Sequence, residues 1–459
     1  MSVAEVDSAG ERNTSKLPRF LRPPPPAQPI HAEPEEIRRI TSHYRSRILF
    51  WTTTGYGTFY FVRKNLSVAM PIIGEQLGIS KAMLGLILTV HEVVYGISKF
   101  VNGMVADRAN ARILMSMALL VSAVLNICFG LSSAALFFGI FWMLNGLFQG
   151  MGYPPCARLL THWFGPKELA TKMSIWNASH SIGGGAIVIL CGYLISHYGH
   201  EHWRLCFFVP SAIAVAMAAL LFLNLRDTPE SIGLPEVEGT HQPDPTNSDE
   251  SPEEFRQFIW RKVFSNKYIW LISGANFFVY TIRLAVLDWA PTFLKEAKGI
   301  SLGHASLIVA GFEFAGLGGM LVSGWLTDRV CKGRANPVSL VWMLLCGAAI
   351  FCFWRAPVEK FAINATLLMA IGFFIYGPQA LVAVAVANLA TKKAAATAVG
   401  LTSIFGYAST VLSGWGLGLL VQHYGWNRAF PLLIGIAMLG AILFAAALPA
   451  KAHGYGDEE

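Results

Sequence analysis

The stretch Tyr60-Phe61-Val62-Arg63-Lys64 places two adjacent cations inside the first long apolar segment of the sequence. A similar stretch, Tyr280-Thr281-Ile282-Arg283, lies inside a later apolar segment, and Arg283 follows Arg63 by 220 residues (283 − 63). A charged side chain in hydrocarbon costs at least about 2.5–3.5 kcal/mol, so an arginine within a membrane span usually has a function. Two arginines at matching places in two halves of the chain therefore predict a paired anion site.

The composition indicates a protein that crosses a membrane many times. The chain has 459 residues, of which 54% are hydrophobic and 14% are charged, against about 25% charged residues in soluble proteins. Its apolar runs repeatedly exceed the roughly 20 residues that span a bilayer as a helix. We therefore predict an all-α membrane protein with twelve transmembrane helices, arranged as two six-helix bundles related by pseudo-symmetry.

A polar stretch divides these helices into two groups. Residues 1–46 predict a disordered cytoplasmic tail, 47–225 the first six-helix bundle, 226–266 a cytoplasmic middle loop, 267–450 the second bundle, and 451–459 a short tail. Fifteen Lys and Arg residues fall in the middle loop and in the loops after spans two, four, eight and ten, against seven in the loops on the other side. By the positive-inside rule, this bias places both termini and the middle loop in the cytoplasm.

A second pair of motifs supports an internal duplication. Gly103-Met104-Val105-Ala106-Asp107-Arg108 closes the second predicted span, and Gly324-Trp325-Leu326-Thr327-Asp328-Arg329 closes the eighth, 221 residues later (324 − 103). Repeated halves are common among secondary transporters. Their charges predict a latch that forms in one conformation and breaks in another; the alternative is a solvated turn. The predicted latch residues are Asp107, Arg108, Arg112, Asp328 and Arg329.

Polar residues inside the predicted spans extend the arginine pair into a candidate site. The guanidinium group presents a planar fork of donors that suits phosphate or carboxylate oxygens. Lys99 could add a positive charge and His180 a donor that titrates near neutral pH; the alternatives are a lysine that reaches the interface and a neutral core histidine. Three carboxyl groups, Glu92, Asp288 and Glu313, could pair with the arginines or couple protons, and the sequence does not rank them. Six tyrosines could donate hydroxyls or simply fill the core: Tyr56, Tyr60, Tyr95, Tyr280, Tyr376 and Tyr407.

Other functional classes find no support in the sequence. The net charge of +7 is carried by loop cations, without the basic stripe or motif of a nucleic-acid-binding protein. The seven cysteines are odd in number and include no C-x-x-C pair, so neither a disulfide framework nor a metal or cofactor site is indicated. Hydrolase and ATP-binding motifs are absent, so we expect no enzyme. The run Gly183-Gly184-Gly185, deep in a span, predicts close helix packing or a flexible point.

With these residues in hand, the chain resembles the organophosphate:phosphate antiporters of the major facilitator superfamily from about Tyr44 to about Phe444. The motifs that carry the resemblance are Tyr60-Phe-Val-Arg63-Lys64-Asn65, Tyr95-Gly-Ile-Ser-Lys99-Phe100, Phe148 to Cys156, Trp176-Asn-Ala-Ser-His180, Arg226 to Pro235, Tyr280-Thr-Ile-Arg283, Asp288 to Glu296, and Ile375-Tyr376-Gly377-Pro378. Within this family, Pro154-Pro155-Cys156-Ala157-Arg158 and Val286-Leu287-Asp288-Trp289 are most similar to the carriers of glycerol 3-phosphate.

The resemblance implies a carrier in the bacterial inner membrane that exchanges an organophosphate, glycerol 3-phosphate first of all, for inorganic phosphate. It implies that Arg63 and Arg283 grip the phosphoryl group, that Lys99 and His180 assist, and that Asn177 lines the cavity with the six tyrosines. Ser181 departs from the family pattern, in which asparagine follows the histidine, and leaves the organic part of the substrate open. We expect a monomer in the lipid bilayer, without cofactor or nucleic-acid partner. The alternatives are a phosphoglycerate or hexose-phosphate antiporter, a transporter-like sugar-phosphate sensor, and a proton-coupled carboxylate carrier.

Overall fold

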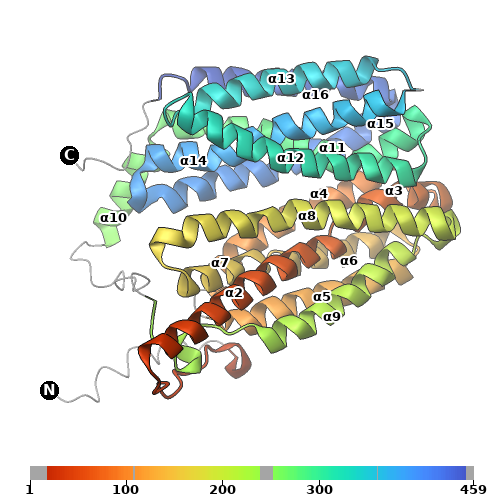
Figure 1. The fold of residues 1–459 in the computed structure, drawn as a ribbon. Coiled ribbons are helices and arrows are strands. Elements are labelled where there is room, and N and C mark those ends of the chain that lie inside the picture. Colours follow the sequence, from red (N-terminus) through yellow and green to blue (C-terminus); the bar gives the residue numbers. More distant parts are fainter. Residues whose placement is uncertain (1–17, 107–108, 238–251, 359, 451–459) are drawn as a thin grey trace.

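The computed structural model describes residues 18–106, 109–237, 252–358 and 360–450. Every regular element of these residues is a helix, and eleven helices are long and apolar enough to cross a membrane. They form two bundles that lie side by side, one from each half of the chain (Figure 1). The predicted all-helical fold with two bundles is thus confirmed, and the count is eleven rather than twelve by the criterion of length and composition.

The N-terminal bundle contains eight α-helices, because two of the predicted spans are broken. These helices are α2 (Pro34–Phe59), α3 (Asn65–Leu77), α4 (Lys81–Ala106), α5 (Ala111–Leu131), α6 (Ala135–Gln149), α7 (Tyr153–Trp163), α8 (Pro166–Tyr198) and α9 (Leu205–Asn224). The span missing from the eleven is the first predicted one: α2 ends at Phe59, a 3-10 turn covers Tyr60–Val62, and α3 begins at Asn65. Arg63 and Lys64 lie at this break, and interrupted helices are typical of binding sites in transporters.

The C-terminal bundle follows a short helix, α10 (Pro252–Ile259), and a π-helical turn (Trp260–Phe264). Its helices are α11 (Lys267–Lys298), α12 (Leu302–Arg329), α13 (Ala335–Arg355), α14 (Phe361–Ala408), α15 (Leu417–Tyr424) and α16 (Trp426–Ala446). Helix α14 covers nearly all of the tenth predicted span (360–386) and part of the eleventh (395–421), because the backbone remains helical between them, where the sequence predicts a loop. A second π-helical turn, Val411–Gly416, joins α14 to α15.

The chain before α2 is ordered from residue 18, which differs from the predicted disordered tail over 1–46; residues 1–17 lie outside the described residues. The backbone N–H groups of Ala27 and Ile30 donate to the carbonyls of Glu230 and Gly233 at 2.9 Å each. Gly233 has a φ of +80°, and a Cβ on it would lie 2.3 Å from the Gln28 carbonyl oxygen. The segment that contains Ala27 and Ile30 lacks a periodic apolar pattern, and backbone hydrogen bonds fix it against the segment that follows α9.

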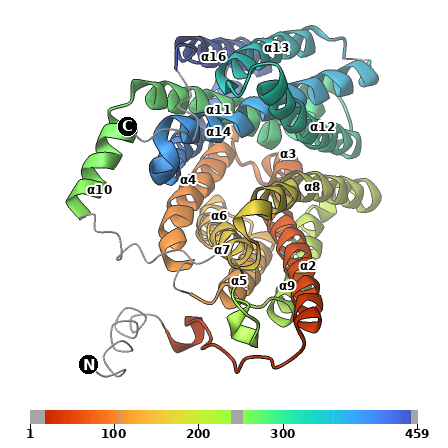
Figure 2. The ribbon, with the colours of Figure 1, turned by 60° about the vertical axis from the view of Figure 1, so that its left-hand side comes forward.

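Helices α3, α4 and α8 lie on the side of the N-terminal bundle that faces the C-terminal bundle, where they meet α11, α12 and α14 (Figures 1 and 2). Two ion pairs join the bundles at the end of the molecule opposite the start of α2, called here the far end. Lys295 Nζ lies 2.6 Å from a Glu75 carboxylate oxygen, and Lys81 Nζ lies 2.9 Å from Glu296 Oε2. The halves are therefore closed against each other at the far end.

Candidate anion-binding site

A cluster of four buried charges forms at the break between α2 and α3. Arg63 Nη2 donates to Glu92 Oε2 at 2.7 Å, and Lys64 Nζ lies 3.2 Å from Glu92 Oε1. Lys64 Nζ also donates to Asp288 Oδ1 of α11 at 2.9 Å, so the cluster crosses from one half to the other. None of these residues is more than 8% exposed, and buried charges persist where they are paired.

Arg283, the second predicted arginine, is also buried, but aromatic rings rather than a carboxylate contact its guanidinium group. Its guanidinium carbon lies 4.7 Å from the ring centroid of Tyr376 and 6.0 Å from that of Tyr280. It makes no ion pair with any residue that the structure describes, and its Nε has no hydrogen-bond partner there. Aromatic faces attract cations without satisfying N–H donors. Arg283 thus keeps hydrogen-bonding capacity for a ligand.

Eight of the predicted site residues form a closed circuit of contacts, called here the aromatic belt: Arg63, Tyr60, His180, Tyr376, Arg283, Tyr280, Tyr407 and Tyr95. In this order, and back to Arg63, the successive separations of ring centroids or guanidinium carbons are 5.4, 6.2, 6.4, 4.7, 6.0, 6.2, 5.2 and 3.9 Å. The structure therefore brings together residues that lie more than 300 positions apart in the sequence.

Each half of the chain contributes four residues to the belt, with one arginine in each set. Only two contacts of the belt cross between the halves. The rings of His180 and Tyr376 are stacked with 6.4 Å between centroids and 11° between planes, and Tyr95 meets Tyr407 edge to face at 5.2 Å. A ligand bound between the arginines would contact both halves at once, which is the arrangement expected of a site at a repeat interface.

Three further predicted residues lie beside the belt. Lys99 Nζ lies 3.9 Å from the ring centroid of Tyr153 and 5.9 Å from that of Tyr407. The ring of Tyr56 lies 5.9 Å from that of Tyr60, behind the belt in the N-terminal half. Asn177 is exposed.

His180 and Asn177 are joined through the backbone, because His180 Nδ1 is hydrogen-bonded to the Asn177 carbonyl oxygen. This bond makes Nδ1 the protonated nitrogen of a neutral ring and leaves Nε2 as an acceptor, so a donor role for Nε2 requires the imidazolium form. Nε2 has no partner among the described residues.

The carboxyl groups that the sequence did not rank now have distinct partners. Glu92 pairs with Arg63 and Lys64, and Asp288 pairs with Lys64. Glu313 of α12 accepts a 2.6 Å hydrogen bond from the hydroxyl of Tyr376. The sequence indicates which polar residues lie at a similar depth in the membrane as Glu313. It does not indicate how the helices are rotated about their axes, and this rotation is what brings Tyr376 to Glu313.

The predicted latch stays a prediction. Asp107 and Arg108 lie outside the described residues. Asp328 and Arg329 are exposed at the end of α12, and neither makes an ion pair with a described residue. Arg112 Nε donates to the Phe222 carbonyl oxygen at 2.5 Å.

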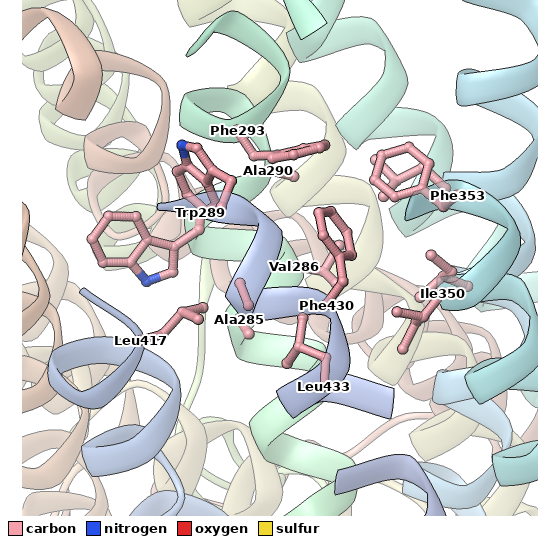
Figure 3. A pocket seen from close by; sticks show the side chains of 14 residues that line it. Ala285, Val286, Trp289, Ala290, Phe293, Ile350, Phe353, Leu417, Phe430 and Leu433 are labelled. Carbon is pink, nitrogen blue, oxygen red and sulfur yellow. The ribbon is translucent and has the colours of Figure 1, made fainter. Parts of the chain in front are cut away.

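Two cavities lie away from the belt. One, of about 50 Å³, is lined wholly by apolar or aromatic residues of the C-terminal half, which come from α11, α13, α14, α15 and α16 (Figure 3). Without a polar side chain aimed into it, this space is a packing defect and offers nothing to an anion. The other, of about 350 Å³, lies between the halves at the far end and is lined by Lys81, Thr292 and Glu296 among others.

Two helix bundles, one from each half of the chain, with buried polar residues between them are the architecture of many secondary transporters. The chain belongs to the Major Facilitator Superfamily, whose family model matches residues 52–414. It is 40% identical over 440 residues to a probable hexose phosphate transport protein of Chlamydia trachomatis (93% of this chain, 95% of the relative). It is 39% identical to a glycerol-3-phosphate transporter of Bacillus subtilis (88% and 91%) and 34% identical to the membrane sensor protein UhpC of Escherichia coli (94% and 98%).

The fold of this chain is also similar to that of a solved transporter structure. A bacterial homologue of the lysosomal transporter Spinster superposes with a TM-score of 0.71 at 18% identity, over 88% of this chain and 97% of that one. At this identity the similarity supports the fold alone.

Proposed function

We propose that this protein exchanges an organophosphate for inorganic phosphate across a membrane. The observation that carries the proposal is the aromatic belt, in which Arg63 of one half and Arg283 of the other are joined by tyrosines and a histidine. Two guanidinium forks can share the oxygens of one phosphoryl group. Because both anions contain this group, one site can serve both.

Exchange follows from the way in which the site joins the halves. Without an anion, Arg63 is paired with Glu92, whereas Arg283 makes no ion pair with a described residue and has only a longer-range attraction to Glu313. The charge of Arg283 is therefore incompletely balanced, and it opposes close approach of the cations of the other half. A phosphoryl dianion between them removes this repulsion and favours a closed, occupied state. Occupancy by either anion therefore permits rocking between states open to opposite sides.

For the organic part of the substrate, we propose glycerol 3-phosphate first and a hexose phosphate second. Relatives of 39% and 40% identity carry these names, and a phosphoglycerate transporter protein of Salmonella typhimurium is 31% identical. A sensor that binds a sugar phosphate without transporting it is the second candidate function, because the UhpC relative is named a sensor.

We further propose that the chain is a monomer in the bacterial inner membrane, with both termini in the cytoplasm. The excess of Lys and Arg on the side of the termini supports this orientation. The far end then faces the periplasm, and its closure by Lys295–Glu75 and Lys81–Glu296 corresponds to a carrier open to the cytoplasm.

The test is exchange in liposomes loaded with phosphate. Wild-type protein should take up labelled phosphate and labelled organophosphate only against internal phosphate. Arg63→Lys should lower exchange by about tenfold and Arg283→Lys by about 100-fold, since a point charge lacks the planar fork and Arg63 already gives one nitrogen to Glu92. Normal exchange by both variants would show that the shared anion site is wrong. Thermal stabilisation by an organophosphate without any measurable flux would support the sensor. Uptake of a carboxylate that external phosphate does not inhibit would support a carboxylate carrier.

A further inference from the structure

Residues 255–267, called here the basic segment, lead into the C-terminal bundle with four cations and no carboxylate. They run from α10 through the π-helical turn to the first residue of α11. The four cations are Arg256, Arg261, Lys262 and Lys267. Arg256 lies 3.9 Å from Glu253, and both side chains are largely exposed, whereas neither Arg261 nor Lys262 makes an ion pair with a described residue. The basic segment therefore presents positive charge that the protein does not balance locally.

Exposed tryptophans fix the height of the basic segment along the bundle. Trp270 lies in the first turn of α11, a helix long and apolar enough to cross a membrane. Its Nε1 donates to the Phe264 carbonyl oxygen at 2.8 Å, and the Phe264 ring lies 5.6 Å from that of Trp260. Trp260 and Trp270 are 66% and 42% exposed. Because exposed tryptophans at the end of a span typically lie at the boundary between hydrocarbon and water, the basic segment lies at the level of the lipid headgroups.

Helix α10 has the placement and the sequence of a helix that lies along a membrane surface. It lies at the end of the molecule opposite the far end and runs across the direction of the long helices (Figure 1), and it stands out from the side of the C-terminal bundle (Figure 2). Among the described residues, it packs chiefly on the π-helical turn that follows it. Apolar residues recur at helical spacing in α10 and this turn: Phe255, Phe258, Ile259 and Val263. Arg256 and Gln257 are exposed beside them, and such two-faced cationic helices bind membrane interfaces.

We propose that the basic segment binds the headgroups of anionic phospholipids in the leaflet opposite the far end, and so fixes the start of the C-terminal bundle to the membrane surface. Clusters of Lys and Arg next to a span attract anionic headgroups, and each cation adds to the attraction. The phosphodiester oxygens accept hydrogen bonds from Arg261 and Lys262, while the Trp260 indole lies at the boundary with the acyl chains. A soluble phosphate anion would meet the same cations but would gain nothing from Trp260.

The test measures lipid binding to the purified full chain by native mass spectrometry. The probes are phosphatidylglycerol, which is anionic, and phosphatidylcholine, which is zwitterionic, with the same acyl chains. Wild-type protein should bind phosphatidylglycerol at about tenfold lower concentration than phosphatidylcholine, because several cations act together. The double variant Arg261→Gln/Lys262→Gln should reduce this ratio to about threefold or less. Equal affinities of the wild type for the two lipids, or an unchanged ratio in the double variant, would overturn the proposal.

Arg38→Gln/Arg39→Gln is the matched control, because it also removes two adjacent cations near the same end of the molecule. Both arginines are exposed on α2, and Glu35 and Glu36 lie one helical turn before them. Since these carboxylates balance the two charges, the control should keep the wild-type ratio. An equal fall of the ratio in the control would show a response to net charge alone and would overturn a site at the basic segment.

Two further arms distinguish a lipid from a soluble anion. Trp260→Ala should weaken the binding of both lipids by about threefold and leave their ratio unchanged, because the indole acts at the boundary with the acyl chains. Glycerophosphoglycerol, which is the phosphatidylglycerol headgroup without acyl chains, should not displace the bound lipid. Displacement by this headgroup, together with unchanged lipid binding by Trp260→Ala, would assign the cations to a soluble phosphodiester and overturn the membrane surface.

Limited trypsin digestion in lipid nanodiscs places the same segment on a bilayer. Cleavage after Arg261 and Lys262 should be about fivefold slower in nanodiscs of phosphatidylglycerol than in nanodiscs of phosphatidylcholine, since headgroups cover these side chains. Cleavage after Arg38 and Arg39 should proceed at similar rates in both lipids. Equal rates after Arg261 and Lys262 would overturn the proposal. Phosphate exchange enters none of these measurements, so their failure would leave the proposed function standing.

Discussion

Lys64 Nζ lies 2.9 Å from Asp288 Oδ1, and this buried ion pair joins the two halves of the chain next to Arg63. Lys64 is also 3.2 Å from Glu92, so its charge is shared between a carboxylate of its own half and one of the other half. Because the pair can persist only while α3 and α11 stay close, it favours the state in which the far end is closed.

Asp288→Asn should lower the melting temperature of the purified protein. Removal of one partner from a buried ion pair typically costs about 3–5 kcal/mol, and Glu92 should compensate part of this loss for Lys64. The double variant Lys64→Met/Asp288→Leu removes both charges and should recover much of the stability. A double variant as unstable as Asp288→Asn would mean that the packing of Asp288, rather than its charge, is what matters.

The two arginines should respond unequally to substitution by lysine. Arg63 already gives one nitrogen to Glu92 at 2.7 Å, whereas Arg283 makes no ion pair with a described residue and is only attracted at longer range by Glu313. We expect Arg283→Lys to raise the KM for phosphate about tenfold more than Arg63→Lys does, because more of its fork is available to the anion. KM values from initial rates of exchange test this. Equal values, or the reverse order, would contradict the difference in pairing.

Tyr95 should act through its ring face rather than its hydroxyl. The Arg63 guanidinium carbon lies 3.9 Å from its centroid, and a buried cation–π contact contributes about 2 kcal/mol. Tyr95→Leu should therefore weaken phosphate binding by roughly 30-fold, whereas Tyr95→Phe keeps the face and should stay within about threefold of the wild type. Titration of ligand-dependent thermal stabilisation measures both. A strong loss in Tyr95→Phe would assign the role to the hydroxyl instead.

Gly183 is required where α2 and α8 approach closely. A Cβ at this position would lie 2.3 Å from the backbone oxygen of Gly57, which cannot move without a shift of the whole helix. Gly183→Ala should therefore abolish folded protein, as judged by size-exclusion chromatography in detergent. Gly139→Ala is the matched control, because a Cβ there has no atom within 4 Å. It should be tolerated or slightly stabilising.

The two ion pairs at the far end should stabilise the state in which this end is closed, and their loss should make opening of this end more frequent. Lys295→Glu places like charges next to Glu75 and should increase the labelling rate of a cysteine introduced at Thr292, which lines the far-end cavity. The swapped variant Glu75→Lys/Lys295→Glu restores opposite charges and should return the rate toward that of the parent. Partly exposed pairs contribute only about 0.2–1 kcal/mol, so we expect a change of about fivefold or less. It should shrink in high salt; a salt-independent change would exclude a charge effect.

Much of the site could be predicted from the sequence because its residues are chemically out of place in apolar segments. The two arginines and His180 stand out in this way, whereas only the resemblance to the antiporter family implies a cavity role for the tyrosines. The pairing of Lys64 with Asp288 could not be predicted, since it depends on how α3 and α11 are rotated toward each other. Asn177 shows another limit: it lies on the same face of α8 as His180, one turn earlier, and the sequence does not predict that it is exposed there.

The segment before α2 shows a different limit of sequence reasoning. Residues such as Ala27 and Ile30 have no periodic apolar pattern, and their order comes from backbone hydrogen bonds to Glu230 and Gly233. Such bonds are available to any sequence and leave no compositional mark, except where Gly233 adopts a conformation suited to glycine.

The belt also determines how the two halves can part. Its two crossing contacts, His180 with Tyr376 and Tyr95 with Tyr407, are between rings, with no hydrogen bond or ion pair between these partners in the described structure. Ring faces and edges can slide past each other with little loss of contact, whereas hydrogen bonds must break in one step. The belt therefore resists sliding of the two halves less than the ion pairs around it do, so the main energetic cost of their separation lies in charges such as those of Lys64 and Asp288.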